Sequence, residues 1–122
     1  MQNNIFINLT NHPSDKWDEK QIMAANQYGS ILDIPFPAIP AECDENYIKE
    51  LGAELVKKIL GNNPTAVLCQ GEFTLAYYVI SELRKKNIIV LAACSNRKVK
   101  EDGNKKIVEF SFERFREYKE EA

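Results

Sequence analysis

Short apolar runs along the chain predict a set of β-strands. Ile5–Leu9 is a β-favouring run that stops at the turn-forming residues 10–14. Thr65–Gln70 has the composition of a buried strand. Ile88–Cys94 is apolar at every position, which is typical of a central strand covered on both faces. Two further strands are predicted at 31–34 and 107–115.

A helix is predicted after the first strand, from the residues that would begin and end it. Asp18 and Gln21, three residues apart, have the form of a capping box. This pair predicts a helix that begins near Glu19 and runs to Tyr28. Gly29 then supplies the left-handed residue that ends it.

Two more helices are predicted further along the chain. Asp44 is a natural N-cap for the apolar stripe between Tyr47 and Ile59, and Gly61 ends that helix. The third helix follows a tight glycine turn at 71–74 and carries its apolar positions at 75–83.

The predicted order of elements is β-α-β-α-β-α-β-β, in a single domain over residues 1–122. Alternating strands and helices favour a parallel sheet with right-handed crossovers. The hairpin signal Asp102-Gly103-Asn104 adds a C-terminal antiparallel edge strand. The expected fold class is therefore α/β, a Rossmann-like three-layer sandwich with a mainly parallel sheet.

Composition supports this fold and excludes several other classes of protein. The chain has 122 residues, of which 44% are hydrophobic, so disorder, collagen and coiled coil are excluded. Its longest apolar run, Ile88–Cys94, is far below the roughly 20 residues of a membrane helix. Residues 1–4 do not resemble a signal peptide. We expect a cytoplasmic protein with no membrane partner.

Cysteine and histidine usage argues against a metal or a disulfide framework. Cys43, Cys69 and Cys94 are an odd number and form no C-x-x-C pair. His12 is the single histidine, so one chain cannot build a histidine cluster. We expect reduced thiols, no metal and no cofactor.

Charge is distributed unevenly along the chain. The net charge is −2, but residues 84–106 hold eight cations and two acidic residues. Such a basic zone can attract a polyanion. It is more typical of a solvated hairpin tip kept soluble by lysines.

Unusual polar residues follow the predicted strands where each of them ends. In an open parallel sheet, ligands bind outside the carboxyl ends of the strands. We therefore predict that these loops converge on one site. Its candidate residues are Asn11, His12 and Ser14 after the first strand, Gln70, Gly71, Glu72 and Thr74 after the third, and Ser95, Asn96 and Arg97 after the fourth.

Three of these residues have both a chemical and a structural interpretation. His12 can exchange protons near neutral pH, or it is a loop residue bonded to the backbone. Arg97 can hold a phosphate with two hydrogen bonds, or it pairs with a surface Glu. Glu72 can contact a ribose hydroxyl, or it favours the dipole of the helix that follows it.

Three short motifs resemble a known group of proteins. They are Asn8-Leu9-Thr10-Asn11-His12-Pro13-Ser14, Gly71-Glu72-Phe73-Thr74 and Ser95-Asn96-Arg97. Together they resemble small bacterial proteins associated with CRISPR loci. The layout is similar to a minimal CARF-like Rossmann-like domain, the kind that binds cyclic oligoadenylates and that cleaves them in ring nucleases.

This resemblance implies a homodimer with a shared cleft, rimmed by basic residues, over a cyclic oligonucleotide. Cleavage would need no metal: a ribose 2′-hydroxyl would attack the adjacent phosphodiester and leave a 2′,3′-cyclic phosphate. It implies His12 as general acid or base, Arg97 as stabiliser of the developing charge, and Ser14 or Ser95 as a positioning donor. The chain departs from the pattern in having one histidine and no lysine in the predicted strand-end loops.

Two other functions stay open. A non-catalytic nucleotide sensor would use the same residues without turnover. A protein-interaction module would use the aromatic final strand, with Phe110, Phe112 and Phe115, and would ignore nucleotides. No long nucleic acid is expected as a partner.

Overall fold

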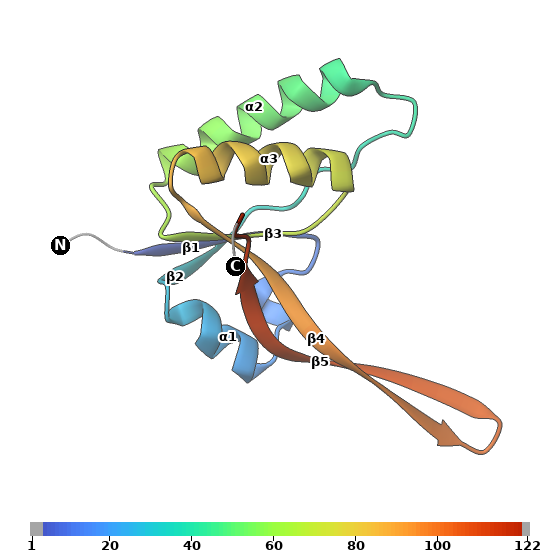
Figure 1. Ribbon diagram of the computed structural model, residues 1–122. Coiled ribbons are helices and arrows are strands. Elements are labelled where there is room, and N and C mark those ends of the chain that lie inside the picture. The colour runs from blue at the N-terminus through green and yellow to red at the C-terminus, as the bar shows by residue number, and fades with distance from the viewer. Residues whose placement is uncertain (1–3, 121–122) are drawn as a thin grey trace.

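A computed structural model of the protein describes residues 4–120, which form a mixed α/β fold with a five-stranded, mostly parallel sheet (Figure 1). Three α-helices and a short 3₁₀ helix at Ser14–Lys16 accompany the sheet in this part of the chain. The strands are β1 (Ile5–Leu9), β2 (Ser30–Asp33), β3 (Ala66–Cys69), β4 (Ile89–Asp102) and β5 (Lys105–Glu117). The helices are α1 (Glu19–Asn26), α2 (Glu45–Gly61) and α3 (Phe73–Lys85).

The strands lie in the order β2-β1-β3-β4-β5. The first four are parallel to one another, and β5 pairs with β4 in the antiparallel direction. The predicted sequence of elements and the antiparallel edge strand are thus confirmed. Figure 1 shows α2 and α3 over one face of the sheet and α1 over the other.

Each face of the sheet has its own apolar core. Ile7, Val67 and Val90 pack toward α2 and α3, while Phe6, Leu68 and Leu91 pack toward α1. Neighbouring residues of a strand point to opposite faces, so a strand buried on both sides is apolar throughout. This accounts for the continuous apolar runs in β3 and in the first part of β4.

The helices begin at the residues that the sequence indicates, but two of their ends differ. Asp18 accepts a hydrogen bond from the backbone N–H of Gln21 at 2.8 Å, so the cap is confirmed. The helix α1 ends at Asn26 rather than Tyr28. Gly61 is still helical, and the left-handed residue after α2 is Asn63, with φ of 48°.

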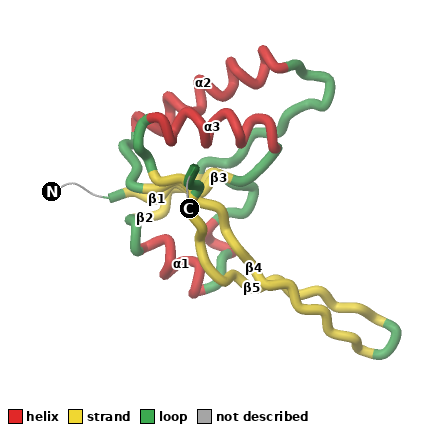
Figure 2. The backbone as a smooth tube through the Cα atoms, in the orientation of Figure 1, coloured by secondary structure: helices red, strands yellow, loops and turns green. Residues whose placement is uncertain are grey.

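The largest departure from prediction is the length of the last two strands. β4 was expected to end at Cys94 but continues to Asp102, so Ser95, Asn96 and Arg97 lie within a strand and not in a loop. Residues 95–112, called the arm below, form a two-stranded ribbon. Figure 2 shows it extending beyond the helices. Pairing between its own strands holds this charged segment in β-structure.

No helix within residues 4–120 is long and apolar enough to cross a bilayer.

Candidate functional site

A pocket of about 730 Å³ lies beyond the ends of β1 and β3 and beside the inner part of β4, on the face covered by α1. Its walls include residues 10–13 of the β1–α1 loop, Gln70 after β3, and Ser95 and Phe110 of the hairpin. This volume lies within the roughly 300–1,000 Å³ of small-molecule sites. Of the predicted site residues, Asn11, His12, Gln70 and Ser95 line this cavity, and Ser95 does so from within β4 rather than from a loop after it. Below, this cavity is called the strand-end pocket.

A buried hydrogen-bond network holds the β1–α1 loop over the sheet. Asn8, only 1% exposed, donates from Nδ2 to the carbonyl oxygen of His12 at 2.9 Å. The hydroxyl of Thr10 donates to Oδ1 of Asn8 at 2.8 Å and accepts from the backbone N–H of His12 at 3.1 Å. Trp17 Nε1 donates to the same His12 carbonyl oxygen at 3.0 Å. The backbone on both sides of the His12 side chain is thus fixed.

Asp33, the last residue of β2, ties the same loop to the neighbouring strand. One of its carboxylate oxygens accepts from Asn8 Nδ2 at 2.9 Å, and the other accepts from the hydroxyl of Ser14 at 2.9 Å. The backbone N–H of Ser14 points at both oxygens, at 3.3 Å. Ser14 does not line the strand-end pocket, and its hydroxyl hydrogen is directed to Asp33. Ser14 therefore holds the β1–α1 loop against β2.

His12 is exposed and lines the pocket. The contacts that fix this residue are made by its backbone N–H and carbonyl group. This arrangement leaves the imidazole at the pocket wall, where it can meet a ligand. Lys16 and Asp18 add one charge of each sign to the same lining.

The side chain of Gln70 continues the hydrogen bonding between β3 and β4 by one bond. Its Oε1 accepts a hydrogen bond from the backbone N–H of Ala93 at 2.6 Å, just beyond the last paired residues of β3 and β4. The oxygen is therefore used by the sheet, while the amide NH₂ group keeps two donors for a ligand. Amide donors of this kind bind the acceptor atoms of a base or a phosphate.

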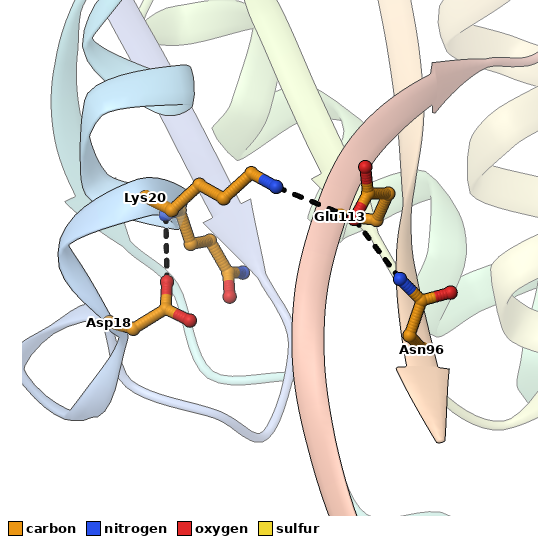
Figure 3. A network of polar contacts seen from close by, with 5 residues as sticks. Asp18, Lys20, Asn96 and Glu113 are labelled. Atoms are coloured by element: carbon orange, nitrogen blue, oxygen red, sulfur yellow. Dashed lines mark hydrogen bonds and ion pairs between the residues drawn. The ribbon is translucent and has the colours of Figure 1, made fainter. Parts of the chain in front are cut away.

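The hairpin changes register where it leaves the body of the protein. Cys94 pairs with Arg114 and Ser95 pairs with Phe112, so Glu113 is an extra residue in β5, a β-bulge. Glu113 accepts a hydrogen bond from Asn96 at 3.1 Å and forms an ion pair with Lys20 of α1 at 3.4 Å (Figure 3). These contacts join α1 to the base of the arm.

The bulge also determines how the predicted residues of β4 are placed. Ser95 lines the pocket, and Arg97 lies on the same face of the ribbon, directly opposite Phe110. Asn96 faces the other side, because side chains alternate along a strand, and its amide is bonded to Glu113. Arg97 does not line the pocket, but it lies opposite Phe110, which does. Asn96 supports the base of the arm through Glu113.

The glycine turn before α3 is not part of this pocket. Glu72 is the N-cap of α3 and accepts hydrogen bonds from the backbone N–H groups of Thr74 and Leu75 at 2.9 and 3.0 Å. The side-chain hydrogen bond from Thr74, followed by these backbone bonds, lowers the pKa of Glu72. Glu72 and Thr74 line a separate pocket beside the start of α2. The structure therefore does not bring Glu72 to His12, and its carboxylate serves the helix.

Gly71 has a packing role. A Cβ atom at this position would collide with the ring of Phe36, which is buried in the core between the sheet and the two helices. Phe36 is thus part of the core. Phe73 is 88% exposed and points into solvent.

Several residues of the site were not foreseen from the sequence. Asn8 and Asp33 hold the loop, and Trp17 and Phe110 help to form the wall. Asn8 did carry a signal: it is a polar residue inside an apolar strand, and buried polar groups are hydrogen-bonded. Within residues 4–120 no three His, Cys, Asp or Glu side chains are grouped closely enough to hold a metal ion.

Comparison with known proteins gives a family but no activity. Nothing among the curated proteins matches the chain, and no solved structure matches it. A family model, described as that of the uncharacterized protein MJ1673 family, matches residues 4–116, nearly the whole of the 122-residue chain. The chain therefore belongs to the MJ1673 family of uncharacterized proteins.

Proposed function

We propose that this protein is a cytoplasmic, Rossmann-like domain that binds a cyclic oligoadenylate in the strand-end pocket. The observation that carries the proposal is the convergence of Asn11, His12, Gln70 and Ser95 on one cavity of about 730 Å³. In open α/β sheets, ligands occupy the carboxyl ends of the strands at the point where the strand order reverses. Here β1 has β2 on one side and β3 on the other, so the pocket lies beside that point.

The lining offers groups that suit the parts of an oligoadenylate. Phe110 is 70% exposed at the wall, so its ring is free to stack on an adenine base. The amide NH₂ of Gln70 and the hydroxyl of Ser95 can donate to base or phosphate acceptors. Lys16 in the lining and Arg97 opposite Phe110 supply positive charge for the phosphates.

The same site supports metal-independent cleavage of the ring. The 2′-hydroxyl of one ribose attacks the adjacent phosphorus, forming a 2′,3′-cyclic phosphate while the bond to the 5′-oxygen breaks. His12 accepts the proton of the 2′-hydroxyl or donates one to the departing 5′-oxygen. Arg97 stabilises the negative charge on the phosphorane oxygens.

A non-catalytic sensor is the second candidate, and one observation favours it. The contacts that fix His12 all involve its backbone, whereas a general base is usually oriented by a hydrogen bond to its ring. A sensor would bind the same ligand through Gln70, Ser95 and Arg97 and release it intact.

A protein-interaction module of the same fold is the third candidate. The exposure of Phe110, 70%, favours it, because large aromatic side chains on a surface often contact a partner. Such a module would bind through β5 and would ignore nucleotides.

The test is incubation of the purified protein with labelled cyclic tri-, tetra- and hexa-adenylate. Cleavage that is lost in His12→Ala and in Arg97→Ala supports the enzyme. Binding without cleavage, unchanged in His12→Ala, supports the sensor. If no oligoadenylate raises the melting temperature at saturating concentration, both nucleotide functions are refuted and the interaction module is left.

Salt dependence tests the phosphate contacts separately. If Arg97 and Lys16 contact phosphates, affinity falls steadily as ionic strength rises. The fall is smaller in Arg97→Ala, because one charge contact is gone. A flat response in the wild type would remove these cations from the ligand contacts.

A further inference from the structure

The arm is a two-stranded ribbon that extends away from the rest of the sheet. Beyond Leu91, where β3 stops pairing, β4 has β5 as its neighbour within the described residues. None of the helices in the described part of the chain covers the outer part of this ribbon, as Figures 1 and 2 show. An isolated two-stranded ribbon is marginally stable in water at best. An extended, regular arm is therefore expected to pack against something.

One face of the arm is apolar at its centre. Residues directly opposite each other in a ladder lie on the same face, and the register pairs Val99 with Val108 and Arg97 with Phe110. The side chains of Val99, Val108 and Phe110 are 51%, 40% and 70% exposed. Two residues further toward the body, the same face carries Phe112, which is buried in the core beneath α1. The apolar surface is thus continuous from the core out along the arm.

We propose that this face packs against the same face of a second copy of the chain, with the two arms running in opposite directions. A two-fold axis at the level of Val99 and Val108 brings each valine against its own counterpart. A two-fold interface uses one patch on both copies, so the patch must be complementary to itself. The charges of the arm meet this condition.

On β4, the residues two positions to either side of the axis carry opposite charges. Arg97 and Phe110 form one layer on the side of the body, and Glu101 and Lys106 form the matching layer on the side of the tip. In the antiparallel arrangement Arg97 of one copy meets Glu101 of the other. Lys106 meets the ring of Phe110, a cation–π contact. Parallel arms are excluded because α1, on the same face at the base of each arm, would have to occupy the interface.

The dimer has a consequence for the strand-end pocket that rests on the proposed function. Phe110 is part of the pocket wall, so Lys106 of the second copy reaches the pocket mouth. The lining of one chain holds Lys16 and Asp18, of opposite charge. The second copy therefore places Lys106 at the pocket mouth as a hydrogen-bond donor for a phosphate, while its Glu101 pairs with Arg97. A bound phosphate must displace that Glu101 to reach the Arg97 guanidinium.

Sedimentation equilibrium without ligand tests the interface, with two adjacent substitutions as a matched pair. Val108 and Ile107 are similarly exposed, 40% and 45%, but they point to opposite faces of the arm. The wild type is expected to dimerise in the micromolar range. Val108→Lys raises the dissociation constant about tenfold or more, because it places a charge at the apolar centre. Ile107→Lys leaves it within about twofold.

Charge reversal tests the antiparallel register itself. Arg97→Glu and Glu101→Arg each place like charges together and weaken the dimer, and the double variant restores it. Within one chain these two residues are four positions apart on the same strand, so the rescue reports a contact between copies. A melting temperature for each variant verifies that it is folded.

A wild type that stays monomeric overturns the proposal. Equal weakening by Val108→Lys and Ile107→Lys, or a double variant as weak as the single variants, does so too. The proposed function fails in a different way, since a chain that dimerises but binds no oligoadenylate keeps the interface and loses the ligand. If Val108→Lys is monomeric and binds oligoadenylate as tightly as the wild type, the second copy is not part of the pocket.

Discussion

Substitution of Asn8 by Ala tests whether the pocket depends on the hydrogen-bond network beneath its loop. Asn8 is buried in β1 at 1% exposure, and its amide makes contacts with three partners. It donates to the carbonyl oxygen of His12 and to Asp33, both at 2.9 Å, and accepts from Thr10 at 2.8 Å. Alanine removes all three bonds at once.

The expected loss follows from the number of bonds. A hydrogen bond within a protein contributes about 0.5–1.5 kcal/mol net, so three of them contribute roughly 1.5–4.5 kcal/mol to the free energy of unfolding. Part of the network survives, because Trp17 still donates to the His12 carbonyl and Ser14 still donates to Asp33. We therefore expect a loss of about 2–3 kcal/mol rather than the upper value.

Equilibrium unfolding in urea, followed by circular dichroism, measures this loss. The matched control is Asn11→Ala, in the same loop, where the side chain is exposed and lines the pocket. The control should change the free energy of unfolding by less than about 0.5 kcal/mol. Asn11→Ala should weaken oligoadenylate binding while the chain stays fully stable, whereas Asn8→Ala should weaken both binding and stability.

A change of less than about 0.5 kcal/mol in Asn8→Ala would refute the reasoning, since it would show that the network does not hold the loop. If Asn8→Ala is destabilised but binds the ligand with normal affinity, the β1–α1 loop does not position the site, and that part of the reasoning is refuted.

Three further predictions concern the remainder of the fold. Glu72→Ala should lower the melting temperature at neutral pH. Because hydrogen bonds hold the pKa of Glu72 below its usual value, its contribution is present above the usual pKa of Glu and is lost as pH falls through the folded pKa. The two melting curves should thus converge in acid, and a constant difference would contradict the cap. Burial raises the pKa of Cys69 to about 12, so iodoacetamide at pH 8 should label the two partly exposed cysteines and reach Cys69 only on unfolding. Gly71→Ala should cost about 1–3 kcal/mol by displacing Phe36, while Gly61→Ala, where nothing lies within 4 Å, should be neutral or stabilising by urea unfolding; equal effects would contradict this packing.

The parts of the fold that follow an apolar period could be predicted from the sequence. The strand at Ala66–Cys69 is a continuous apolar run, and the strand at Ile5–Leu9 is apolar apart from Asn8. Asp18 and Asp44 are helix caps visible in the sequence. The outer part of β4 could not be predicted in this way. Its charged residues have no core to face, so they leave no apolar pattern, and only pairing with β5 makes them a strand.

The candidate site was predictable as far as strand order determines it. His12 and Gln70 meet because β1 and β3 are neighbours and end at the same edge of the sheet. Ser95 joins them from within β4, which continues past that edge. Glu72 was misplaced because the start of α3 lies over the other face of the sheet, a detail that strand ends do not reveal. The link between Asn8 and Asp33 joins positions 25 residues apart, so it appears only when the chain is folded.

The most direct test of the account is an NMR titration of the isotope-labelled protein with cyclic tri-, tetra- and hexa-adenylate. The account predicts that at least one of them shifts the backbone amides of Asn11, His12, Gln70 and Ser95. It also predicts that the amides of Glu72 and Thr74, in the separate pocket, stay in place. No shift with any ligand, or shifts confined to Glu72 and Thr74, would contradict the claim that the strand-end pocket is the functional site.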